Sequence, residues 1–107
     1  MTEIKNDAAL QLQQKTLTLD TPVTRGKEQI TSVTLRKPQS GALRGTRLQA
    51  LMDMDVNAMM TVIPRISQPA LQPHEIAEMD PADLLSLSAE VVTFLLPKSV
   101  LSDFPTN

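Results

Sequence analysis

The chain has 107 residues, of which 41% are hydrophobic, and its formal net charge is −2. A chain of this length corresponds to one domain. Its mixed charges and its two aromatic residues provide neither the positive field nor the stacking platforms on which nonspecific nucleic-acid binding depends. Cysteine is absent, which excludes disulfides and thiolate chemistry. The polar N-terminus lacks the apolar core of a signal peptide, and no apolar run approaches the ~20 residues that span a bilayer. We therefore expect no nucleic-acid and no membrane partner.

A β-hairpin is predicted in the first third of the chain. Residues 1–14 are polar and rich in glutamine, and we interpret them as a flexible arm. Residues 16–20 alternate strictly between leucine and polar side chains, which is typical of a half-buried strand, and residues 30–36 are rich in β-branched residues. Pro22 and Gly26 interrupt the polar segment between them, as turn residues do.

The apolar side chains of this hairpin share one face. Leu17 and Leu19 lie in phase on the first strand, and Val33 and Leu35 lie in phase on the second. Ile30 is out of phase with that second pair, which indicates a bulge or a late strand start. Because an isolated hairpin is barely stable in water, we expect helices to cover its apolar face.

A helix is predicted directly after the hairpin. Pro38 ends the second strand, and Ser40 is the candidate N-cap of a helix that continues to Met52. Gly45 lies inside that helix, where it either weakens the helix by about 1 kcal/mol relative to alanine or marks a break.

Two more short helices are predicted in the middle of the chain. The first covers residues 56–63, with Asp55 as its N-cap, and Pro64 should kink or stop it. Residues 67–72 are interpreted as a linker. The second short helix covers about residues 73–79, because proline is favoured at a first helical position.

The strongest helix signal lies near the C-terminal end. Asp80 is the predicted N-cap, and Asp83 favours the positive end of the helix dipole. The helix covers about residues 82–96, and residues 98–107 are interpreted as a flexible tail. These elements predict an α+β fold, with a small N-terminal β-hairpin packed on three to four short helices, in a single domain over residues 15–97.

No residue pattern indicates catalysis. The single histidine, His74, lies at a helix start, where a solvated side chain is far commoner than a catalyst or ligand. The pairs Asp53/Asp55 and Asp80/Asp83 also lie at predicted helix starts, where aspartate serves as a cap. The three glycines form no phosphate-binding loop. We therefore predict a non-enzymatic protein without a catalytic, cofactor or metal site.

Basic residues surround the junction between the second strand and the following helix. Most clusters of this kind are solvated surface. The alternative is a docking site for an acidic segment of a partner. The cluster consists of Arg36, Lys37, Arg44 and Arg47.

Five segments in order carry a family resemblance. They read Ile-Thr-Ser-Val-Thr-Leu-Arg-Lys-Pro (30–38), Ser-Gly-Ala-Leu-Arg-Gly (40–45), Leu-x-x-Leu-Met-x-Met-Asp-Val (48–56), Val-Ile-Pro-Arg-Ile-Ser-x-Pro (62–69) and Met-Asp-Pro-Ala-Asp-Leu (79–84). No single segment is diagnostic, but their order and spacing together are specific. Over residues 16–97 the chain resembles the tail assembly chaperone family of Mu-like and related contractile-tailed temperate bacteriophages.

The resemblance implies a non-enzymatic factor that binds the tape measure protein and keeps it soluble while tail tube subunits polymerise around it. Such a factor acts in the host bacterial cytoplasm and is absent from the mature virion. The tail tube protein and a longer form of the chain are its other expected partners. The alternative is a minor structural component of the tail or baseplate, present in the virion.

Independently of the resemblance, an exposed edge of the hairpin could pair with a further copy of the chain. The alternative is that Pro22, Lys27, Lys37 and Pro38 protect that edge.

Apolar residues of the two middle helices are the candidate contacts for a tape measure protein. Methionine side chains adapt to irregular partner surfaces, and an amphipathic client helix could lie against them. The alternative is that these residues form the core beneath the hairpin. The set consists of Leu48, Leu51, Met52, Met59, Met60 and Ile63.

The resemblance also implies a second, longer product made by a −1 ribosomal slip near the end of the short form. Thr93-Phe94-Leu95 can be encoded as ACT-TTT-TTG, which contains the slippery heptamer T-TTT-TTG. A slip at that point would replace the chain after Leu95 with a longer extension. The codons of the gene decide whether the site exists.

Overall fold

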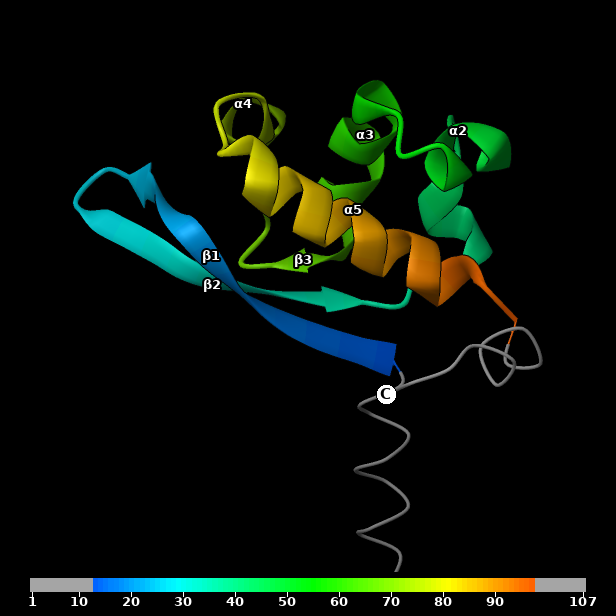
Figure 1. Ribbon diagram of the computed structural model, residues 1–107, viewed down its shortest axis with the longest axis horizontal. Helices are drawn as coiled ribbons and strands as arrows, with labels where there is room; N and C mark the ends of the chain where they lie inside the picture. The colour runs from blue at the N-terminus through cyan, green and yellow to red at the C-terminus, as the bar shows by residue number, and fades with distance from the viewer. Residues whose placement is uncertain (1–12, 98–107) are drawn as a thin grey trace, which may run out of the picture.

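The computed structural model describes residues 13–97, which form two layers. One layer is an antiparallel three-stranded sheet, and helices pack on one of its faces (Figure 1). The predicted α+β fold is therefore confirmed. The predicted arms, residues 1–14 and 98–107, lie outside the described residues, apart from Gln13 and Gln14 at the start of the first strand. In chain order the elements are β1 (Gln14–Arg25), β2 (Glu28–Arg36), the 3₁₀ helix η1 (Ser40–Leu43), α2 (Leu48–Met52), α3 (Val56–Ile66), β3 (Ser67–Gln68), α4 (Pro73–Ala77) and α5 (Pro81–Leu95).

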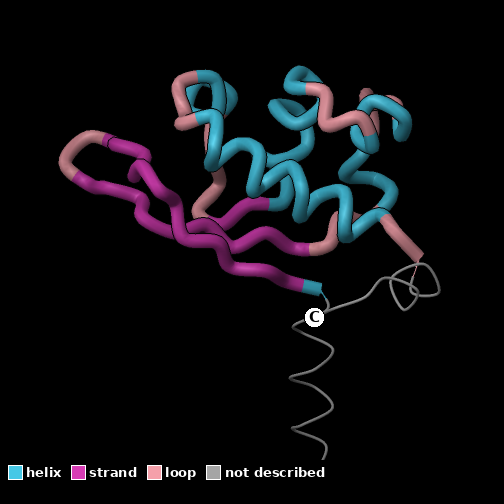
Figure 2. The backbone as a smooth tube through the Cα atoms, in the orientation of Figure 1, coloured by secondary structure: helices cyan, strands magenta, loops and turns pink. Residues whose placement is uncertain are grey.

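Strands β1 and β2 form the predicted hairpin, and both are longer than their sequence patterns indicate (Figure 2). Gly26 lies in the turn with a φ of 61°, a left-handed conformation that glycine adopts without strain. The register shifts between Thr18 and Val23, so β1 carries an irregularity of the β-bulge type. Of the two alternatives that the phase of Ile30 left open, the bulge is therefore correct, and it lies in β1. A late strand start is wrong, because β2 begins at Glu28, and both Ile30 and Val33 are buried.

The short strand β3 is a feature that the sequence interpretation missed. Residues 67–72 were expected to form only a linker, but Ser67 and Gln68 pair with Leu35 and Thr34 of β2. Two polar residues carry no alternating pattern, so nothing local predicts this pairing. It forms because the chain leaves α3 beside the end of β2.

The continuous helix expected between Ser40 and Met52 is wrong. The chain instead forms the single turn η1, a break, and then α2. Gly45 adopts a φ of 85°, which a right-handed helix does not accommodate. The Thr46 hydroxyl closes the turn by donating to the carbonyl of Leu43 at 2.6 Å. Gly45 is therefore a break and not a weakened helical position.

A side chain from α3 holds this broken segment in place. Arg65 Nη1 donates to the carbonyl oxygens of Ala42 at 2.9 Å and of Arg44 at 2.7 Å. Gln39 and not Ser40 occupies the N-cap position of η1, and its side chain makes no capping bond. The turn is therefore stabilised by a tertiary contact and not by the local cap that the sequence suggested.

Helix α3 begins as predicted and ends later than predicted. The Asp55 carboxylate accepts from the Ala58 N–H at 3.0 Å, so Asp55 is the N-cap. Pro64 lies inside the helix, which continues to Ile66. Proline in a last turn removes only one helical hydrogen bond, and burial of Ile66 keeps that turn against the core.

Helix α5 is attached to the bulge of β1 by a buried carboxylate. Asp80 is its N-cap and accepts from the Ala82 N–H at 2.9 Å, as predicted. Asp83 is only 3% exposed, and it accepts from the backbone N–H groups of Asp20 at 2.7 Å and Thr21 at 3.0 Å. The bulge thus exposes backbone donors that α5 satisfies, and one aspartate fixes the helix to the sheet.

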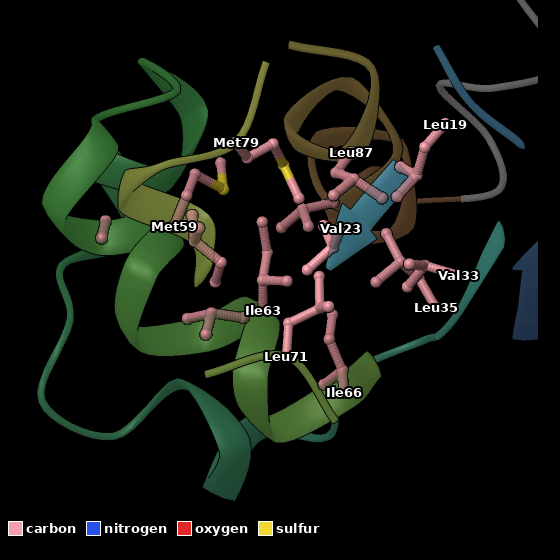
Figure 3. Packing of buried hydrophobic residues seen from close by; sticks show 14 of the residues in the cluster. Leu19, Val23, Val33, Leu35, Met59, Ile63, Ile66, Leu71, Met79 and Leu87 are labelled. Carbon is pink, nitrogen blue, oxygen red and sulfur yellow. The ribbon is translucent and has the colours of Figure 1, made fainter. Parts of the chain in front are cut away.

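The core lies between the sheet and the helices (Figure 3). It is almost entirely aliphatic, with two methionines and one phenylalanine that fill the spaces between branched side chains. Its members are Leu19, Val23, Ile30, Val33, Leu35, Leu51, Ala58, Met59, Val62, Ile63, Ile66, Leu71, Ile76, Met79, Leu87, Val91 and Phe94.

An ion pair joins the tip of the hairpin to α4. The Arg25 guanidinium donates to Glu75 from Nε at 3.0 Å and from Nη2 at 2.6 Å, and Nη2 also donates to the Ala70 carbonyl at 2.8 Å. Glu75 is buried and accepts in addition from the Gln72 N–H at 2.8 Å. The Arg25 hydrogen bond, supported by the Gln72 N–H, lowers the pKa of Glu75 to about 2.

This ion pair predicts an acid-sensitive contribution to stability. Because the folded-state pKa lies below the ordinary value of 4.5, the contribution is complete above that value and is lost as the pH falls from about 4.5 to about 2. We expect Glu75→Gln to lower the free energy of unfolding by about 1–2 kcal/mol at pH 7, since exposure of Arg25 screens part of the interaction. In thermal melts of the natural protein and of Glu75→Gln, the difference in melting temperature should shrink as the pH falls from 7 to 2. A difference that does not change with pH would contradict this assignment.

Candidate partner interface

Three of the predicted contact residues belong to the core. Leu51, Met59 and Ile63 have no exposed surface, and they pack beneath the sheet and among the helices. For these three residues the structure favours the alternative that they form the core, because in the folded domain they present no surface to a partner. Helical spacing placed them on an apolar face correctly, but only packing decides whether such a face turns inward.

The other predicted apolar contacts remain accessible. Leu48 is 61% exposed and Met52 is 40% exposed, and Met60 is half-buried beside the core. Leu48 and Met52 are four residues apart on α2, so they lie on the same side of the helix. They stay candidates for a partner contact.

Two more exposed apolar residues follow directly in the chain. Met54 is 37% exposed in the turn after α2, and Val56 is 52% exposed at the start of α3. The sequence interpretation missed both because it assigned this stretch to helix capping. Their signal was an apolar residue on either side of the capping Asp55, where a solvated turn would normally be polar. We call the four residues Leu48, Met52, Met54 and Val56 the α2–α3 corner.

The turn within the α2–α3 corner has the hydrogen bonds of a Schellman motif. The Met54 N–H donates to the Leu51 carbonyl at 3.0 Å, and the Asp55 N–H donates to the Ala50 carbonyl at 2.9 Å. Met54 adopts a φ of 57°, at the position where glycine is normally found. A methionine side chain is therefore presented to solvent from a backbone conformation that disfavours any residue with a Cβ atom.

Replacing Met54 with glycine should stabilise the domain while removing part of the corner. We expect Met54→Gly to raise the free energy of unfolding by about 0.5–1 kcal/mol, because the left-handed conformation is free of strain in glycine. Denaturant unfolding of both proteins measures this, with the nearby exposed substitution Gln49→Ala as control. A loss of stability would mean that the Met54 side chain packs more than its exposure indicates.

The basic cluster at the strand-to-helix junction is exposed, as the structure places Arg36, Lys37, Arg44 and Arg47 on the surface. Arg36 donates from Nη2 to the Arg65 carbonyl at 3.0 Å, which ties β2 to the end of α3. Hollows of about 610 Å³ and 440 Å³ flank the stretch from Arg36 to Gln39. The cluster thus has the exposure that a docking site needs, and its role in partner binding stays a prediction.

The carboxylates serve structural purposes. Asp55 and Asp80 are helix caps, and Asp83 holds the β1 bulge. Asp53 was expected at a helix start but follows the end of α2, where it accepts from the Gln49 side chain at 3.0 Å. Within residues 13–97, no group of three or more metal-ligating side chains lies together. No helix in that range is long and apolar enough to cross a membrane.

Comparison with known proteins identifies the family. A family model for phage tail assembly chaperone proteins, described as E, or 41 or 14, matches residues 16–96. The chain belongs to the phage tail assembly chaperone family. The chain is 45% identical over 84 residues to tail assembly protein E of Escherichia phage P2, with 78% of this chain and 92% of protein E aligned. No solved structure matches it.

A second relative comes from the same phage. Tail assembly protein E′ of Escherichia phage P2 is 42% identical over 91 residues, which is 85% of this chain but 64% of E′. E′ therefore extends well beyond the part that aligns with this chain. The family match at residues 16–96 includes the α2–α3 corner and the basic cluster, so both candidate surfaces lie in the shared domain.

Proposed function

We propose that this tail assembly chaperone is a non-enzymatic factor that binds the tape measure protein of its phage and keeps it soluble during tail tube assembly. Family membership supports a role in tail assembly. The α2–α3 corner supports the binding part, since it presents four large apolar side chains within nine residues of chain. Clustered apolar side chains of this kind are typical of protein-binding surfaces.

The exposed apolar side chains of the corner suit a partner that is itself helical and apolar, such as a tape measure protein. A tape measure protein presents long apolar helical stripes, which aggregate in water unless they are covered. Two methionines at the corner can adjust to different side chains along such a stripe, and an amphipathic helix can lie against them. The contact is small, so several copies of the chaperone would act on one client.

The proposed cellular setting follows from this role. The chaperone acts in the host bacterial cytoplasm, releases its client when the tube is complete, and is absent from the mature virion. A minor tail or baseplate component would instead stay in the particle. Mass spectrometry of purified virions separates the two, since the stoichiometric presence of this chain would refute the chaperone role.

A longer form made by a −1 ribosomal slip at Thr93-Phe94-Leu95 is part of the proposal. E and E′ of phage P2 both align with this chain, and E′ is the longer. Helix α5 ends at Leu95, and Phe94 is the last buried core residue. A slip there would leave α5 and every buried core residue in place and replace only the chain after Leu95, so both forms would carry the same α2–α3 corner.

Co-expression tests the central claim. The chaperone and the tape measure protein of the same phage are produced together, and the soluble yield of the tape measure protein is compared with that from expression alone. We expect the soluble yield to rise several-fold and the two proteins to co-purify. An unchanged yield with a folded chaperone would contradict the proposed function.

A further inference from the structure

The outer edge of β1 carries backbone groups that the described domain leaves unpaired. Among residues 13–97 the strand order is β1-β2-β3, so β1 lies at one border of the sheet (Figure 1). The Lys37 N–H donates to the Gln13 carbonyl at 2.6 Å, which makes these two residues a hydrogen-bonded pair of the antiparallel ladder. Because hydrogen-bonded and non-hydrogen-bonded pairs alternate, the N–H and C=O groups of Gln14, Thr16 and Thr18 point away from β2.

A side-chain contact supports this orientation. Side chains of a non-hydrogen-bonded antiparallel pair approach each other closely. Thr16 pairs with Thr34, and their hydroxyl oxygens lie 2.8 Å apart. Thr16 therefore belongs to the outward-directed set.

Proline, lysine and β-bulges normally protect a sheet edge from pairing, and in this hairpin most of them lie outside residues 14–18. Pro22 and Lys27 are near the tip, and Pro38 follows β2. The bulge of β1 begins after Thr18, and within it the N–H groups of Asp20 and Thr21 donate to Asp83. Residues 14–18 thus form a regular, proline-free edge in which Lys15 is the one charged residue.

We propose that this edge pairs with the same edge of a second copy of the chain, antiparallel and with the two-fold axis at Thr16. Each Thr16 then donates to and accepts from the Thr16 of the other copy, and Gln14 does the same with Thr18. The pattern is self-complementary, as a two-fold interface requires. It joins the two three-stranded sheets into one continuous sheet.

The side chains of residues 14–18 are compatible with this register. On the face away from the helices, threonine lies opposite threonine and Gln14 opposite Thr18, with no like charges facing each other. On the helix face, Lys15 lies opposite the half-buried Leu17, over which its aliphatic stem can extend. An unrelated partner strand has no comparable symmetry to fix its register.

A single cysteine tests the pairing in a chain that contains none. Cα atoms of a hydrogen-bonded antiparallel pair are about 5.5 Å apart, which suits a disulfide. Under mild oxidation of the full-length protein we expect Thr16→Cys to become mostly a covalent dimer. Ser32→Cys is the matched control, because it is also exposed but lies on β2, at least about 14 Å from its counterpart across the axis.

A proline substitution tests the same pairing without oxidation. Thr16→Pro removes an N–H that the hairpin does not use, so its melting temperature should stay near that of Thr16→Val, which keeps the N–H. Sedimentation equilibrium should show a concentration-dependent dimer for the natural chain and for Thr16→Val, and a monomer for Thr16→Pro. A folded Thr16→Cys protein that stays monomeric, or equal cross-linking of Ser32→Cys, would overturn the proposal even if Thr16→Pro fails to fold.

Discussion

Replacing Asp83 with alanine should lower the free energy of unfolding by about 2–4 kcal/mol. The Asp83 carboxylate is almost fully buried and accepts hydrogen bonds from the Asp20 and Thr21 N–H groups. Bonds to a charged acceptor are the stronger kind, and removing the acceptor leaves two partly buried donors without a partner. The substitution therefore affects both the bulge of β1 and the first turn of α5.

Two milder substitutions separate the effect of the carboxylate charge from that of the hydrogen-bond geometry. Asp83→Asn keeps one acceptor oxygen and should lose roughly half as much stability as the alanine variant. Asp80→Asn retains a good N-cap side chain, so it should lower the free energy of unfolding less than either substitution of Asp83 does. Urea unfolding of the three variants and of the natural protein measures their free energies of unfolding and so tests this ranking. A loss below about 1 kcal/mol for Asp83→Ala would mean that water replaces the carboxylate in the bulge.

The second large effect concerns the proposed binding of the tape measure protein and not stability. The double substitution Leu48→Gln/Met52→Gln replaces two exposed apolar side chains of the α2–α3 corner with a polar residue that favours helix. If each side chain contributes about 1.5 kcal/mol to a client contact, binding should weaken by about a hundredfold. Thermal stability should change little, because Leu48 lies mostly and Met52 partly in solvent, and neither belongs to the buried core.

Helix α5 offers a matched control for this experiment. Leu85 is 61% exposed, as is Leu48, but it lies on a different helix. Under the proposed function we expect Leu85→Gln to solubilise the tape measure protein as the natural chain does, whereas the corner variant should fail to do so. Equal loss in both would indicate a general dependence on surface hydrophobicity, and no loss in either would remove the corner as the client surface.

Local signals were sufficient wherever a single stretch of chain decides its own conformation. The alternation of leucine and threonine predicted β1 because a half-buried strand needs that period. Asp55 and Asp80 predicted the starts of α3 and α5, since a cap satisfies N–H groups only a few residues away. In both cases the interacting groups are close in sequence. The phase of Ile30 indicated only that either a bulge or a late strand start was present, and the strand register decided for the bulge.

Other features depend on partners distant in the chain. Ser67 and Gln68 form β3 only because α3 returns them to the edge of β2. The break after η1 is held by Arg65, about twenty residues away in the sequence. The apolar residues predicted to contact a partner also proved to be of two kinds, some buried and some exposed. Helical spacing cannot tell whether an apolar face such as that of Leu51, Met59 and Ile63 turns to the core or to solvent.

The sequence by itself determined the fold class, the order of most elements and, through the order of five short segments, the family resemblance that the family model then confirmed. These depend on periodicity, caps and composition, which are local properties. The tertiary structure decided which apolar residues remain at the surface. It also showed that Asp83 links α5 to the β1 bulge and which amides of β1 point outward. Burial and strand register arise only when distant segments pack together, and no local pattern contains them.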